Sequence, residues 1–351
     1  LAVEAANSGA PIVTVMGMII AWIGLWIVTI LGIRFPNRSI IKYSEDVLGK
    51  WLARSGSLMI IISFAISTAL TAREFGEVIV TAVLKQTPLE IIIITMLILA
   101  VVSARKDIVV FAYIHNFYLP FIIGPVLIIA ALALKNSDPL YLQPIFGNNP
   151  SGMWTGVLTV AALFQGSFIM TIVIPAMRHP KKALKSSCWG ILIAGGIYVM
   201  IVTVVLSVFG ANETKLLLWP TLELAKMTSL PGQILERLDA VFLIVWVTAV
   251  FTTLLSGYFL TVRATRELFR LKDHKVLPVA FLPFIYIIAM LPQNIFQLYK
   301  IIATVGRWGL LLTIVYPLIV WVTAIIRKKG KKKRYHDGGN RHADKEMETI
   351  D

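Results

Sequence analysis

Long apolar runs bounded by short polar segments dominate the pattern of this chain. A helix that crosses roughly 30 Å of hydrocarbon needs about 20 mainly apolar residues. By this measure the sequence predicts nine membrane-spanning helices, the third and eighth of them short, at 11–33, 57–84, 89–104, 108–134, 154–177, 187–210, 239–262, 277–291 and 299–326. Because the runs are unbroken and do not alternate over about ten residues, they exclude a membrane barrel and predict an all-α integral membrane protein.

Basic residues in the loops predict the orientation of these helices. Along the chain, loops rich in Lys and Arg alternate with nearly neutral loops, and the alternation never breaks register. The basic segments are 34–56, 105–107, 178–186, 263–276 and the tail from Arg327. Because cytoplasmic loops carry an excess of Lys and Arg, these segments and the C-terminus are expected on the cytoplasmic side, with Leu1 outside.

An odd number of spans, with no initiator methionine or signal-peptide pattern at residue 1, leads us to expect that a first helix is missing from this sequence. Ten spans with both ends inside are typical of five-plus-five inverted-repeat transporters, in which the first helix of each repeat is broken at mid-membrane. The sequence therefore predicts a permease-like domain over 1–327, with a repeat boundary near 136–153, and a basic then polar cytoplasmic tail over 328–351.

The span that would open the second repeat, 154–177, carries Phe164, Gln165, Gly166 and Ser167 near its centre. A glutamine inside a spanning helix must find partners away from lipid, and glycine loosens the helix. We interpret this segment as a broken helix whose exposed backbone groups bind a small ligand. The alternative is close packing of small residues against a neighbouring helix.

Two further spans carry hydroxyl side chains along one face. Ser63 and Ser67 recur at helical spacing in the second span, and Thr248, Thr252 and Ser256 recur likewise in the seventh. In the inverted-repeat architecture these helices line the central site, so both faces are candidates for binding the same ligand. The alternative is that each hydroxyl bonds back to the carbonyl one turn earlier, as is common for Ser and Thr in membrane helices.

Charged side chains inside spans are another indicator of a functional site. Arg73, Glu74 and Glu77 lie near the outer end of the second span, where a structural ion pair is the favoured interpretation. His115 lies a third of the way into its span, and a packed, hydrogen-bonded role is favoured there over proton coupling. Since no Asp or Glu is expected in the candidate pocket, the pattern favours a neutral or zwitterionic ligand.

Two shorter helices are expected at the membrane surfaces. The apolar residues of 39–54, among them Ile40, Trp51 and Leu52, lie on one stripe with Lys and Glu between them. This pattern is typical of an amphipathic helix on the inner surface. On the outer side, Pro220 indicates the first turn of another short helix.

Composition and charge narrow the function. Hydrophobic residues make up 57% of the 351 residues and charged residues 15%, whereas about 25% of an average soluble domain is charged. The net charge of +14 does not indicate nucleic-acid binding, because the run 327–334 directly follows a span, where anionic lipids attract it. The scattered histidines, the single cysteine and the lack of a P-loop, nucleophile elbow or dinucleotide fingerprint indicate no metal, no cofactor and no enzyme activity.

Four short motifs resemble the permease-like B subunits of spore germinant receptors, which belong to the amino acid–polyamine–organocation superfamily. They are YSEDVLGKW at 43–51, REFGE at 73–77, WPTLELA at 219–225 and ERLD at 236–239. The resemblance covers about 1–327 and implies a multi-pass sensor of the spore inner membrane. Such a subunit binds a small nutrient, often an amino acid, and acts with an A-type and a C-type subunit. The alternative is an autonomous secondary transporter for an amino acid or related solute, because fold alone does not separate the two.

Overall fold

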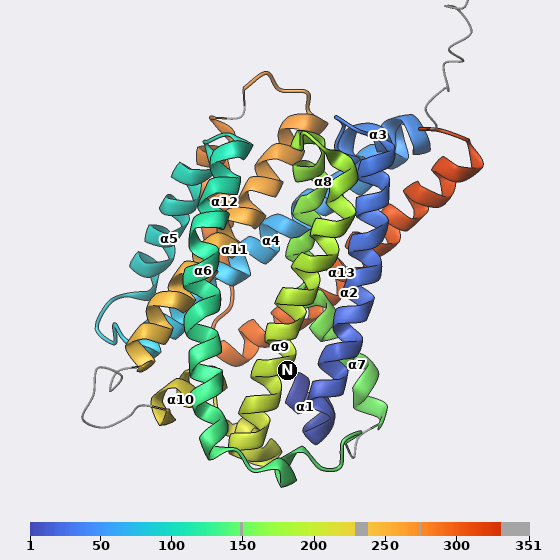
Figure 1. The fold of residues 1–351 in the computed structure, drawn as a ribbon. Helices are drawn as coiled ribbons and strands as arrows, with labels where there is room; N and C mark the ends of the chain where they lie inside the picture. Colours follow the sequence, from blue (N-terminus) through green and yellow to red (C-terminus); the bar gives the residue numbers. More distant parts are fainter. Residues whose placement is uncertain (148–149, 229–237, 274, 331–351) are drawn as a thin grey trace, which may run out of the picture.

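The computed structural model describes residues 1–147, 150–228, 238–273 and 275–330. Within these residues every regular element is helical, and the helices form a bundle (Figure 1). The predicted tail from 331 onward, and Glu236 and Arg237 of the fourth motif, lie outside the described residues. The all-α architecture that the apolar runs predict is confirmed.

A helix stands at each of the nine predicted spans. Six of them are long and apolar enough to cross a membrane, two are apolar but shorter, and one is a bent pair. In chain order they are α2 (Ala10–Arg34), α4 (Lys50–Ala82), α5 (Leu89–Ala104), α6 (Ile108–Ala133), α7 (Pro150–Leu163) with α8 (Met170–Val173), α9 (Ala183–Leu216), α11 (Leu238–Leu268), α12 (Leu277–Met290) and α13 (Ile295–Ile326). The protein is therefore a multi-pass membrane protein.

Short helices fill the connections between the spans. Those built as α-helix are α1 (Ala2–Ala6), α3 (Ile40–Leu48) and α10 (Pro220–Met227). The 3-10 turns are η1 (Asn7–Gly9), η2 (Leu134–Asn136), η3 (Pro139–Leu142), η4 (Gln165–Ile169), η5 (Ile174–Ala176) and η6 (Pro180–Lys182). Helix α10 has its proline in the first turn, as the sequence predicts, and it lies at the end of the bundle opposite α3 (Figure 1).

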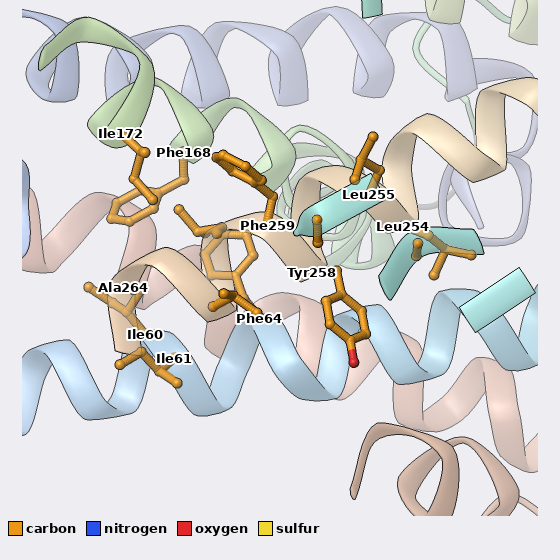
Figure 2. Packing of buried hydrophobic residues seen from close by; sticks show 14 of the residues in the cluster. Ile60, Ile61, Phe64, Phe168, Ile172, Leu254, Leu255, Tyr258, Phe259 and Ala264 are labelled. Carbon is orange, nitrogen blue, oxygen red and sulfur yellow. The ribbon is translucent and has the colours of Figure 1, made fainter. Parts of the chain in front are cut away.

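Helix α4 is the central helix of the bundle. It packs along α11, α13, α12 and α5, and 56% of its most apolar stretch is buried, against 17% for α6. Its residues Ile60, Ile61 and Phe64 join a core shared with α11 and with the segment after α7 (Figure 2). There the rings of Phe64 and Phe168 stack with their centroids 5.7 Å apart. This packing holds the bent fifth span against α4.

Helices five places apart among the nine spans pack against each other in three pairs. These pairs are α2 with α9, α4 with α11, and α5 with α12. An inverted repeat relates helices of two equivalent halves in this way. The pairing supports the five-plus-five arrangement, which stays a prediction.

The surface helix expected over 39–54 is interrupted. Helix α3 ends at Leu48, and Gly49 takes a φ of 93°, a left-handed conformation that suits glycine and ends the helix. Trp51 and Leu52 therefore belong to α4, where they are 90% and 60% exposed, whereas Ile40 is 1% exposed. The prediction of one continuous apolar stripe was wrong because glycine separates two helices with different axes.

Ion pairs fix α3 to the ends of neighbouring helices. The Glu45 carboxylate accepts hydrogen bonds from Arg54 at 3.0 Å and from Arg270 at 2.8 Å. The Arg54 bond, followed by Arg270, lowers the pKa of the Glu45 carboxyl below its usual range. Because the folded-state pKa is depressed, this stabilisation is present at neutral pH and is lost as the pH falls through that pKa.

A glycine sets the end of the span predicted over 187–210. Helix α9 continues to Leu216, but Gly210 interrupts it with a φ of 70° and a ψ of 169°. A Cβ atom at this position would lie 3.2 Å from the Tyr141 ring. The kink therefore requires glycine, and it lies at the residue where the apolar run stops.

The arrangement of the helices predicts the result of a topology experiment. Tags placed in 34–56, 178–186, 263–276 and after 327 are expected to report one side of the membrane, and tags in 136–152 and 211–234 the other. The reason is the alternation of basic and neutral loops. The side of each tag is measured by its accessibility in sealed vesicles. A tag on the wrong side would show that one of the predicted spans does not cross the membrane.

Candidate functional site

The bent fifth span contains the break that the sequence predicts. Helix α7 ends at Leu163, Phe164 takes a φ of −89° and a ψ of 4°, and the 3-10 turn η4 follows. The two halves are bent by 41°. Since 3-10 geometry replaces the α-helical bonds here, backbone groups near Gln165 are released from the regular ladder. The predicted break is therefore confirmed, and the geometry alone does not assign it a ligand.

Gly166 lies on the open side of this break. It is exposed, and a Cβ atom built on it would have no described atom within 4 Å outside its own helix and chain neighbours. Close packing through Gly166, the alternative interpretation of this segment, is therefore absent among the described residues. Phe164 is buried instead, with its ring 5.3 Å from that of Tyr198 in an edge-to-face arrangement.

Gln165 ties the break to α13. Its Nε2 donates a hydrogen bond of 2.8 Å to the carbonyl oxygen of Gly306. A Cβ atom at Gly309 would lie 2.1 Å from Gln165 Oε1 and 3.1 Å from Ser63 Oγ. The missing side chain at Gly309 thus lets α13 approach the break closely, and it brings Gln165 and Ser63 to the same place.

A small cavity lies between α2, the break and α13. Its volume is about 20 Å³, and its wall includes Phe164, Gln165, Ser167 and Thr313. Most of the residues that line it are apolar. A space of this size holds no more than about one water molecule, so the cavity is smaller than an amino acid.

The serines of α4 lie beside these groups. Ser63 and Ser67 are half-buried, and within the described part of the chain neither hydroxyl makes a hydrogen bond, whereas Thr71 donates to the Ser67 carbonyl at 2.9 Å. Hydroxyls without a partner in a membrane protein are available to a ligand or to water.

The hydroxyls of α11 are engaged differently. Thr248 donates to Val245 O at 2.7 Å, Thr252 to Ala249 O at 2.9 Å and Ser256 to Thr252 O at 2.9 Å. These bonds are the local back-bonds that the alternative interpretation expects. The structure therefore brings Ser63 to the break but gives the α11 hydroxyls partners within their own helix.

His115 links the C-terminal part of this α11 face to α6. Its Nε2 lies 2.9 Å from Ser256 Oγ, and its Nδ1 lies 2.8 Å from the Phe111 carbonyl oxygen. One turn further along α11, Phe259 stacks on Phe111 with ring centroids 4.6 Å apart, and it lies beside Phe64 and Phe168 (Figure 2). This geometry is that of a packed and hydrogen-bonded histidine, which is the role that the sequence favours.

Two features of the site were not found from the sequence. The first is the pair of glycines on α13, Gly306 and Gly309. The sequence held a signal for it, because Gly306, Gly309 and Thr313 recur at helical spacing and therefore lie on one helix face. The second is the pairing of the charged residues of α4: Arg73 forms its ion pair with Glu77 and not with Glu74. Among the described residues, no three His, Cys, Asp or Glu side chains gather as a metal ion would require.

The sequence matches known proteins over most of its length. The family model described as "spore germination protein" matches residues 1–298. The spore germination protein YndE of Bacillus subtilis (strain 168) is 26% identical over 90% of this chain and 87% of the relative. Spore germination protein B2 of the same organism is 25% identical over 93% and 90%, and spore germination protein GerLB of Bacillus cereus is 23% identical over 95% and 88%.

Proposed function

The chain belongs to the spore germination protein family, and from this premise we propose that it is the nutrient-sensing subunit of a germination receptor. It binds a small nutrient such as an amino acid at mid-membrane and passes a conformational change to an A-type and a C-type partner subunit. The observation that carries the proposal is the break at Gln165, Gly166 and Ser167, because a spanning helix has 3-10 geometry there and an open side at its glycine.

The ligand contacts follow from the groups that converge on the break. Backbone groups of Phe164 to Ser167 meet the ligand on one side, with the Ser63 and Ser67 hydroxyls on another. Thr248, Thr252 and Ser256 close the remaining side once their local bonds exchange for bonds to the ligand. N-terminal ends of half-helices favour negative charge, so a ligand carboxylate suits the turn after the break.

Location and orientation form part of the same proposal. The receptor lies in the spore inner membrane, with the basic loops, α3 and the C-terminus on the cytoplasmic side. The end of the bundle that carries α10 then faces outward, and the nutrient arrives from that end. Basic loops on one side of the bundle support this orientation.

Removal of the partner subunits tests the sensing role. Spores that keep this chain but lack the A-type and C-type subunits are expected to lose the germination response, because a sensor must pass its signal on. Germination is followed by loss of optical density, and the chain is checked by immunoblot of the membrane fraction. Ion release triggered by the isolated chain in liposomes would contradict the proposal, and robust accumulation of a nutrient by that chain in vesicles would favour the transporter.

A further inference from the structure

A carboxylate inside the α4 span has no basic partner. Arg73, its chain neighbour, donates from Nε and Nη2 to Glu77 Oε1 at 3.0 and 2.9 Å. Within the described part of the chain, no Lys, Arg or His nitrogen lies within 4.0 Å of Glu74. A charge in a spanning segment is costly unless it is paired, and such residues commonly face a ligand path. Glu74 therefore requires a cation or a proton that the described residues do not supply.

An aromatic side chain contacts this carboxylate, and a second aromatic ring lies beside the first. The hydroxyl of Tyr299 on α13 donates to Glu74 Oε1 at 3.1 Å. The Trp219 ring is centred 6.2 Å from that of Tyr299. Glu74 and Tyr299 are both half-buried, so a small molecule can reach part of each side chain. A carboxylate beside aromatic rings is the chemistry that selects an ammonium group.

The helix that carries Tyr299 also contacts the break. Tyr299 stands two turns before Gly306, the partner of Gln165. On α4, Glu74 lies three turns beyond Ser63 on the same helix face, roughly 16 Å along the axis. That distance exceeds the length of a small amino acid, so Glu74 belongs to a separate position on the α10 side of the break.

We propose that Glu74 and Tyr299 form a binding position for an ammonium group, where an amine-bearing nutrient is held before it reaches the break. The inference rests on the proposed sensing function and specifies its ligand class. It gives Glu74 a role outside the mid-membrane pocket, whereas the sequence alone favoured a structural ion pair for this region.

Thermal unfolding of the full chain in nanodiscs tests the proposal with defined probes. The amine-bearing probes are the common L-amino acids, propionate is the deaminated counterpart of L-alanine, and D-glucose and inosine are uncharged. We expect amine-bearing probes to raise the unfolding midpoint. Glu74→Gln should need about tenfold to a hundredfold more of them for the same shift, since a charge-assisted hydrogen bond is lost. Glu90→Gln, which alters an exposed carboxylate at the start of α5, is the matched control and should match the wild type.

A second variant keeps the test decisive if Glu74→Gln folds poorly. Tyr299→Phe keeps the ring and removes the hydroxyl that holds Glu74, and we expect a shift of about two- to tenfold. Unchanged curves for amine-bearing probes in both variants, or no stabilisation by any of those probes, would overturn the ammonium position. Stabilisation by D-glucose or inosine alone would overturn it as well, while a germination response that depends on the partner subunits would leave the sensing function standing.

Discussion

Gly166→Leu is expected to abolish the nutrient response while the protein still inserts and folds. The position is exposed, and a Cβ atom there meets no described atom within 4 Å, so the leucine enters open space without a clash. Leucine also favours a regular helix over glycine by roughly 0.8–1 kcal/mol. The side chain would therefore block the approach of a ligand to the backbone at the break. The measurement is a nutrient dose–response of spores, with the amount of protein checked.

Gly196 offers a matched control for this substitution. It lies on α9, is also exposed, and likewise has no described neighbour within 4 Å of a built Cβ. Gly196→Leu therefore makes the same chemical change away from the break and should leave the dose–response unchanged. If Gly166→Leu gave an unaltered curve at normal abundance, the mid-membrane site would have to be abandoned.

The spans and the break were predictable because both depend on local sequence. Unbroken apolar runs require helices in lipid, since every backbone group must be bonded within the segment, and a helix stands at each run. Gln165, Gly166 and Ser167 weaken one helix through their own residue types, so the position of the break can be predicted without knowing which helices pack beside it. The kink at Gly210 ends its apolar run for the same local reason.

The partners of the side chains were not predictable because they depend on how distant helices cross. Gln165 bonds a carbonyl on a helix 141 residues away, and Ser256 meets His115 across the same separation of 141 residues. Neither distance is encoded in the spacing along one helix. The end of α3 is a different case, because Gly49 was visible in the sequence but the apolar stripe on both sides of it suggested one helix.

Arg73→Met is expected to lower the free energy of unfolding by about 3 kcal/mol, because it leaves the Glu77 carboxylate largely buried without its cation. The Arg73 and Glu77 side chains are 6% and 17% exposed. The double variant Arg73→Met with Glu77→Met should recover most of the loss, since a packed apolar pair is often as stable as a buried ion pair. Thermal unfolding of the solubilised protein, with size-exclusion chromatography to confirm its homogeneity, measures both effects.

Arg54→Met provides the comparison at the surface. Arg54 also pairs with a glutamate, but its side chain is 48% exposed, so water screens the pair and its loss should cost no more than about 1 kcal/mol. A large effect at Arg73 and a small one at Arg54 would identify the Arg73–Glu77 pair as structural, which leaves Glu74 as the acidic residue of α4 that is available to a ligand. Full stability of Arg73→Met together with a lost nutrient response would instead place Arg73 in the binding site, opposite a ligand carboxylate.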